Sequence, residues 1–283
     1  MMPPASAIPF YLAAVAYAAS GILSLRYIRG SESQILISAK RMAAAGNLLL
    51  LAVFLYRWWQ FNLVPFTGLG DSLNLFIVLC TGIILSIQRV DAMRPLLAYY
   101  LPALAILALI NTSVGHLYLN EPPKALNGFL VTFHVGLIFL SFALFFIASL
   151  TSLAYVNKAR SLKRMKTTGL MHKFPSLEQI DKTLYELISV GYPTFAVTLL
   201  MGFIWAWTER ERLGDSWYIS PRIILAVVMV GFYAACFHIR QFGLLRGPKL
   251  AYVVFFAFVF FFLSYLGIEL LQYGGYSLWE AKG

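Results

Sequence analysis

The stretch NGFLVTFHVGLIFLSFALFFIASLTSLAYVN, residues 127–157, decides the fold class of this chain. It contains no Asp, Glu, Lys or Arg, and His134 is its only histidine. An α-helix needs about 20 consecutive apolar residues to cross the hydrocarbon core of a bilayer, and this stretch is longer than that. We therefore expect residues 127–157 to form a membrane-spanning helix.

Working outward from this stretch, the chain has seven further apolar runs of similar length. They lie at roughly 8–28, 39–57, 71–89, 95–113, 185–208, 221–243 and 248–272. Because 60% of the 283 residues are hydrophobic and only 12% are charged, most of the apolar surface must face lipid. The sequence predicts an all-α, polytopic membrane bundle of about eight transmembrane helices, which forms a single domain over residues 1–283.

The basic residues predict the orientation of the bundle. The formal net charge is +10, and 16 of the 22 basic residues fall in connections on one side. They are Arg26, Arg29, Lys40, Arg41, Arg89, Arg94, Lys158, Arg160, Lys163, Arg164, Lys166, Lys173, Lys182, Arg240, Arg246 and Lys249. The positive-inside rule places this side in the cytoplasm of a multi-pass cell-membrane protein and both termini outside. Because topology accounts for the charges, no nucleic-acid partner is expected.

The longest polar interruption, residues 157–184, is predicted to be a basic cytoplasmic loop. Within it SLEQ, residues 176–179, has the form of a capping box. Apolar residues at helical spacing follow it and predict a short amphipathic helix on the inner membrane face. Gly191 and Pro193 favour a bend before the next span.

On the outer side, short loops rich in aromatic residues, Pro and Gly are expected to cover the bundle. One of them, residues 208–220, runs into GDSWYISPR, residues 214–222. Trp217 in this loop is either an aromatic anchor at the lipid headgroups or part of a ligand platform. Cys80 and Cys236 lie inside separate spans and are expected to be buried apolar residues.

Several stretches together resemble the cytochrome c assembly membrane proteins of the CcsA/ResC, CcmC and HemX types. The stretches are YRWWQFNLVPFTGLGDSLNLF (56–76), FHVGLIFLSFALFFIASLTSLAYV (133–156), SLEQIDKTLYELISVGYPTFAVTLLMGFIWA (176–206), FYAACFHIRQFGLLRGPK (232–249) and YLGIELL (265–271). Their order and spacing are similar to the family pattern over most of residues 47–272. The chain is identified as a divergent member.

The resemblance implies that haem, as non-covalently bound haem b, is held at the extracytoplasmic face. Trp217 would belong to a flat platform for the porphyrin, Arg222 would pair with propionates, and His134 would be an axial ligand of the iron. Trp217, Pro221 and Arg222 keep the family's loop pattern, whereas Ile219 replaces its second tryptophan.

The other histidines of the family pattern are only partly present. His238 matches a second, intramembrane haem site, but Leu50 stands where the partner histidine of that site is expected. His134 lies roughly 10 Å and His238 roughly 25 Å below the outer end of its span, so the two cannot share one iron. Tyr276 stands in place of the histidine after the last span, and His116 in an outer loop is an alternative outer ligand.

The function predicted from this resemblance is haem handling in cytochrome c biogenesis, with a membrane partner of the assembly system and apocytochrome c as partners. Three alternatives remain: a HemX-like accessory protein that regulates haem synthesis, a haem-free membrane scaffold, and a small-metabolite transporter. The transporter is disfavoured because the spans carry almost no charge. The sequence displays no catalytic machinery of its own, so any enzymatic role would be that of a component of a haem-attachment complex.

Overall fold

Helix α5 (Phe129–Lys163) is the centre of the molecule. The computed structural model describes residues 4–29, 33–61, 64–65, 69–87, 91–113, 129–164, 173–208, 210, 217–243 and 247–273. The other helices in these ranges are α1 (Pro4–Arg29), α2 (Ser33–Phe61), α3 (Leu69–Ile87), η1 (Asp91–Leu96), α4 (Leu97–Ser113), α7 (Leu177–Thr208), η4 (Trp217–Ile219), α9 (Pro221–Gln241) and α10 (Pro248–Tyr273). Eight of the helices are long and apolar enough to cross a membrane. The prediction of an all-α, multi-pass membrane bundle is confirmed.

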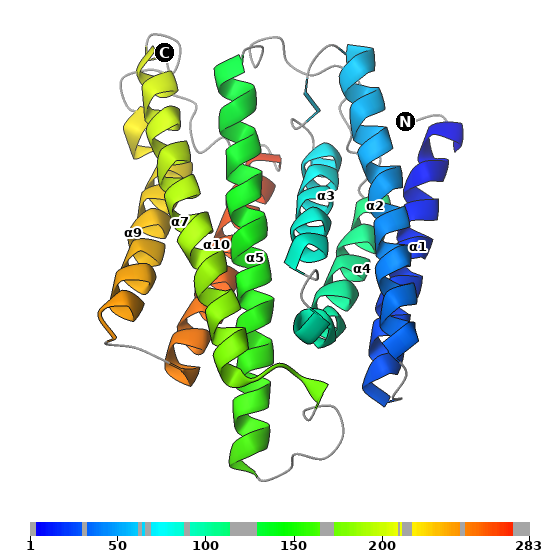
Figure 1. Ribbon diagram of the computed structural model, residues 1–283. Coiled ribbons are helices and arrows are strands. Elements are labelled where there is room, and N and C mark those ends of the chain that lie inside the picture. The colour runs from blue at the N-terminus through cyan, green and yellow to red at the C-terminus, as the bar shows by residue number, and fades with distance from the viewer. Residues whose placement is uncertain are drawn as a thin grey trace.

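The helices are arranged in two groups on either side of α5 (Figure 1). Helix α1 packs against α2 and α4, and α3 packs against α2, α4 and α5. On the other side α7 and α10 pack against α5, and α9 packs against α7 and α10. Helix α5 therefore connects the two groups through contacts with α3 and α4 on one side and with α7 and α10 on the other.

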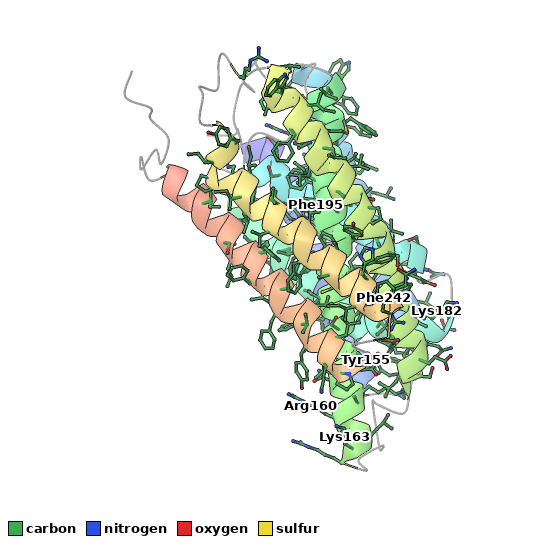
Figure 2. All side chains as sticks on the ribbon, turned by 90° about the vertical axis from the view of Figure 1, so that its left-hand side faces the viewer. Tyr155, Arg160, Lys163, Lys182, Phe195 and Phe242 are labelled. Atoms are coloured by element: carbon green, nitrogen blue, oxygen red, sulfur yellow. The ribbon has the colours of Figure 1, made fainter. Side chains whose placement is uncertain are left out.

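The two ends of the bundle differ in composition. The cations Arg160 and Lys163 near the end of α5 lie at the lower end in Figure 2, and we call this the basic end. The opposite end carries Trp58 and Trp59 at the end of α2, together with Trp205 and Trp207 at the end of α7. We call it the aromatic end. Helix α1 begins and α10 ends at the aromatic end (Figure 1), and the location of the two termini relative to the membrane stays a prediction.

The expectation of a separate amphipathic helix before the sixth span is wrong. Residues 177–208 form one continuous helix, with Pro193 inside it and no break at Gly191. Leu184, Leu187 and Ile188 are at most 5% exposed, so they pack in the bundle instead of lying on the membrane surface. Residues 177–188 therefore form the first turns of α7 and belong to the bundle.

The predicted capping box does form at the start of this helix. The Ser176 amide donates to Gln179 Oε1 at 3.0 Å, and the Gln179 amide donates to Ser176 Oγ at 3.2 Å. These reciprocal bonds satisfy two of the amides that a helix start leaves open. Helix α5 likewise runs on to Lys163, so Lys158 and Arg160 lie on a helix and not in the predicted loop of residues 157–184.

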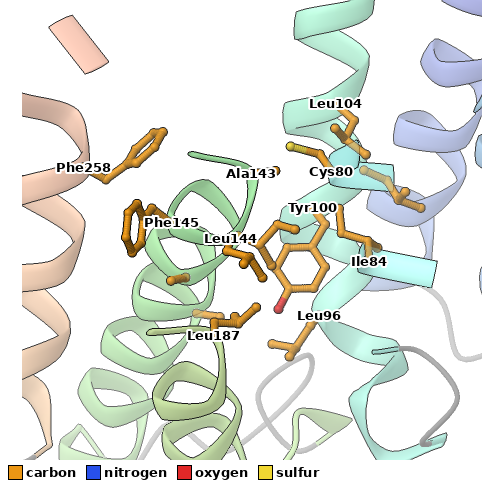
Figure 3. Close-up of a cluster of buried hydrophobic side chains, with 14 of the residues drawn as sticks. Cys80, Ile84, Leu96, Tyr100, Leu104, Ala143, Leu144, Phe145, Leu187 and Phe258 are labelled. Atoms are coloured by element: carbon orange, nitrogen blue, oxygen red, sulfur yellow. The ribbon is translucent and has the colours of Figure 1, made fainter. Parts of the chain in front are cut away.

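The core lies where α3 and α4 meet α5 and α7 (Figure 3). Cys80, Ile84 and Leu104 lie on one side of it, and Leu144 and Leu187 lie on the other. Within this apolar interior the hydroxyls of Tyr100 and Thr151 are 2.8 Å apart and join α4 to α5. Hydrogen bonds of this kind hold membrane helices together, since lipid provides no hydrophobic force between them. Cys80 and Cys236 are both buried and free, as predicted.

Candidate functional site

His134 is held between α5 and α7 near the aromatic end. It lies five residues after the start of α5, roughly 8 Å along the helix. Its half-buried ring places Nδ1 3.0 Å from the backbone carbonyl oxygen of Thr198 in α7. A carbonyl can only accept a hydrogen bond, so Nδ1 carries the proton. In a neutral imidazole Nε2 is then the nitrogen with a free lone pair.

Gly202 makes room for this ring one helical turn after Thr198. A Cβ atom placed on Gly202 would lie 2.8 Å from Cε1 and 3.4 Å from Nε2 of His134. The first distance is shorter than real Cβ contacts, so any larger residue would displace the ring. The Thr198 hydroxyl donates to the Thr194 carbonyl at 2.8 Å, so it bonds within α7. The absence of a side chain at Gly202 therefore allows the imidazole to pack closely against α7.

The described part of the loop that carries Trp217 begins at η4. Trp217 is the first residue of this short 3-10 helix, although its side chain lies outside the described part of the structure. Tyr218 and Ile219 are exposed, and Pro221 then begins α9 at the first helical position, where proline is favoured. Arg222 follows in the first turn of α9 and is exposed. Because α5 and α9 both begin at the aromatic end, Arg222 and His134 belong to the same end of the molecule (Figure 1).

A buried ion pair at this end was missed by sequence reasoning. Arg57 near the end of α2 donates from Nε to Asp71 Oδ1 at 2.8 Å and from Nη2 to Oδ2 at 3.0 Å. The two side chains are only 9% and 3% exposed. Asp71 lies in the first turn of α3, where the helix dipole also favours a negative charge. The sequence signal for this ion pair was an arginine at the end of one apolar run, Arg57, followed fourteen residues later by an acidic residue at the start of the next run, Asp71.

The aromatic end also exposes several tryptophans. Trp59 is 77% and Trp207 is 62% exposed. The Arg210 guanidinium carbon lies 4.9 Å from the centre of the Trp207 ring, which is a cation–π contact. Such rings suit both headgroup anchoring and contact with a flat apolar ligand.

His238 lies at the other end of the bundle. It is 17 residues after the start of α9, and its exposed ring bonds through Nδ1 to the Ala234 carbonyl of its own helix at 2.8 Å. Its ring packs edge-on against Tyr192 of α7 with 6.3 Å between centroids. Along α7, Tyr192 is six residues from Thr198 and ten from Gly202, a separation of roughly 9–15 Å. The structure therefore does not bring His134 and His238 together around one metal ion.

Residue 50, where a second haem-ligating histidine is expected beside His238, is a leucine and cannot ligate iron. Leu50 is 1% exposed and packs in the core, and its carbonyl accepts a hydrogen bond from Asn74 Nδ2 at 3.3 Å. His116 and Tyr276, the two substitute ligands, lie outside the described residues. Within the described residues no three His, Cys, Asp or Glu side chains gather closely enough to hold a metal ion.

Comparisons with known proteins agree with the resemblance seen in the sequence. The family described as Cytochrome C assembly protein matches residues 42–275. The chain is similar to the cytochrome c biogenesis protein CcsA of Synechococcus sp. (strain CC9902), with 26% identity over 260 residues that cover 83% of this chain and 84% of the relative. The CcsA protein of Prochlorococcus marinus (strain AS9601) is 29% identical over 258 residues, which cover 82% and 81% of the two chains. That of Heterosigma akashiwo (strain NIES-293 / 8280G21-1) is 23% identical over 273 residues, 84% of each chain.

Proposed function

The chain belongs to the cytochrome c assembly protein family, and from this premise we propose that it binds haem b non-covalently at the aromatic end and presents it for cytochrome c biogenesis. The observation that carries the proposal is His134. Its Nδ1 proton is engaged by the Thr198 carbonyl, which leaves the lone pair on Nε2, and the ring packs against α7 at Gly202. Histidines that ligate metals usually donate their other ring N–H to a carbonyl or carboxylate in this way.

The residues at the aromatic end fit a haem ligand set of one axial imidazole with aromatic and cationic surroundings. We assign His134 as the axial ligand of the haem iron, with Nε2 as the ligating atom. Trp217 is the proposed platform residue, and Arg222 is the proposed partner for a propionate. When bound, haem would supply the vinyl groups that form thioether bonds with the cysteines of an apocytochrome. The protein's own part is to hold, orient and expose the porphyrin.

The proposed partners follow from what the described residues lack. Cys80 and Cys236 are buried on different helices, so the chain offers no accessible thiol pair in its described part. We propose that apocytochrome c brings the thiols, that a membrane partner of the assembly system completes the complex, and that the complex resides in the cell membrane. His238 remains a candidate ligand for a separate inner haem, with no histidine at Leu50 to pair with it.

The optical spectrum of the detergent-purified protein tests the haem assignment. The wild type is expected to show a Soret band that survives gel filtration. His134→Ala should lose most of this band, and added imidazole should partly restore it by occupying the vacated axial position. His238→Ala is the matched control, and it should leave the outer-site spectrum intact. An unchanged spectrum in His134→Ala would refute the ligand assignment and make His116 the next residue to examine.

The biogenesis role is tested in cells that lack the protein. Haem staining of denaturing gels should show loss of c-type cytochromes, while b-type haem spectra stay normal. Wild-type protein should restore the staining and His134→Ala should not. A parallel loss of b-type haem would instead favour a role in regulating haem synthesis.

A further inference from the structure

A small hollow at the basic end, far from the proposed haem site, has the chemistry of a phosphate site. It has a volume of about 190 Å³ and is lined by Leu36, Ile37, Lys40, Arg94 and Leu97. The lining comes from three elements, because the first three residues belong to α2, Arg94 to η1 and Leu97 to the start of α4. We call it the Lys40–Arg94 hollow.

The hollow combines two cations with an apolar wall. Leu36 and Leu97 are 2% and 1% exposed, so they belong to the packed core and give the hollow a fixed floor. Lys40 and Arg94 are half-buried, and none of the five lining residues is acidic. A guanidinium has five N–H donors, so Arg94 can donate to an anion in the hollow in addition to its contacts within the protein.

The depth of the hollow suits the boundary between hydrocarbon and headgroups. Helix α2 has 29 residues and is about 43 Å long, whereas the hydrocarbon core is about 30 Å thick. Lys40 lies seven residues after the start of α2, roughly 10 Å along it. The excess length of α2 allows its first turns to project into the headgroup region, with Lys40 at the boundary. The floor of leucine and isoleucine can then face the glycerol and upper acyl chain of a lipid.

We propose that the Lys40–Arg94 hollow binds the phosphate group of an anionic phospholipid. The Arg94 guanidinium can donate two parallel hydrogen bonds to phosphate oxygens, and the Lys40 ammonium adds a point charge. Basic pockets between membrane helices on the cytoplasmic side are a recurring form of lipid headgroup site, and the basic end is the end that we predict to face the cytoplasm. The site is independent of haem binding at the aromatic end.

Native mass spectrometry of the full-length protein released from detergent micelles tests the site. Micelles are supplied with phosphatidylglycerol or with phosphatidylcholine of the same acyl chains. The wild type should retain one phosphatidylglycerol in preference to phosphatidylcholine. In Lys40→Gln/Arg94→Gln this preference should fall about twenty-five-fold, by a factor of about five for each cation removed. In Lys40→Gln alone the preference for phosphatidylglycerol should fall about fivefold. This single variant tests the site even if the double variant fails to fold.

The matched control removes the same charge from the same end of the molecule. Lys163 and Arg164 are exposed at the end of α5 and do not line the hollow, so Lys163→Gln/Arg164→Gln should keep the full preference. Equal losses in the two double variants would show that only the general positive charge attracts lipid, and would overturn the site. Equal retention of both lipids by the wild type would overturn it too. A third arm adds inorganic phosphate at constant ionic strength: displacement of the lipid at millimolar phosphate would assign the hollow to a free anion and refute the lipid.

Discussion

At the scale of single residues, the functional argument depends on which nitrogen of His134 carries the proton. The Thr198 carbonyl at 3.0 Å fixes this, because it offers no proton to Nδ1. The bond also fixes the rotation of the ring, so Nε2 has a defined direction beside Gly202. A histidine whose other ring nitrogen donates a hydrogen bond in this manner binds metal more tightly than a freely rotating imidazole.

Gly202→Ala is therefore expected to disturb haem binding without removing any ligand. The new Cβ would lie 2.8 Å from Cε1 of His134, so the ring must move and its bond to Thr198 must weaken. Overpacking of this kind costs about 1–3 kcal/mol. We expect lower haem retention and a shifted Soret band, measured in detergent at equal protein concentration.

The control for this change is Gly136→Ala, two residues from the histidine on α5. A Cβ at Gly136 meets nothing within 4 Å, and alanine favours helix more than glycine does. Haem retention should stay at the wild-type level in this variant. If Gly202→Ala and Gly136→Ala lowered haem retention equally, the loss would come from a change in the helix backbone and not from displacement of the His134 ring.

At the scale of helices, the Arg57–Asp71 pair joins the ends of α2 and α3 where both are buried. Asp71→Ala would remove the carboxylate that pairs with the Arg57 guanidinium, whose side chain is only 9% exposed. Loss of one member of a buried pair costs about 3–5 kcal/mol. We expect a clear fall in the thermal unfolding midpoint, measured in detergent.

Two comparison variants separate charge from packing at this pair. Arg57→Met/Asp71→Leu removes both charges and should be less damaging than Asp71→Ala alone, because no uncompensated charge remains. Lys182→Ala breaks an exposed pair with Glu186, whose side chains are 77% and 61% exposed, and should change stability little. A double variant as unstable as Asp71→Ala would show that the residues matter for shape and not for charge.

The continuity of α7 gives a further test at this scale. Leu184 is 1% exposed in the first turns of α7, whereas Val190 is 55% exposed on the same helix. Leu184→Ala should cost about 2–5 kcal/mol through lost packing, and Val190→Ala should cost much less. Unfolding in detergent measures both. A separate helix lying on the membrane would instead tolerate Leu184→Ala as well as Val190→Ala.

At the scale of the whole molecule, the sequence predicted those features that depend on local composition. The eight spans follow from apolar length, and the Ser176–Gln179 cap from a four-residue pattern. Features that depend on packing were not predictable in this way. The merging of residues 177–184 into α7 requires burial of Leu184, and the His134–Thr198 bond joins residues 64 positions apart. The roles of His116 and Tyr276 stay predictions, since both lie outside the described residues.

Both functional proposals depend on which end of the bundle faces which side of the membrane. Haem presentation needs the aromatic end outside, and the phospholipid proposal expects the basic end at the inner leaflet. Arg160 and Lys163 lie at the basic end (Figure 2), and the positive-inside rule predicts that this end faces the cytoplasm. One experiment on orientation therefore bears on both.

Single cysteines introduced at the two ends measure this orientation in intact cells. Arg164 at the basic end and Arg210 at the aromatic end are both exposed, so thiols placed there can react. The native Cys80 and Cys236 are 0% and 4% exposed and should give little background. With a membrane-impermeant maleimide, Arg210→Cys should label at once, whereas Arg164→Cys should label only after the membrane is made permeable. The reverse pattern would place the aromatic end in the cytoplasm, and haem bound there through His134 could not be presented to an apocytochrome on the outer side.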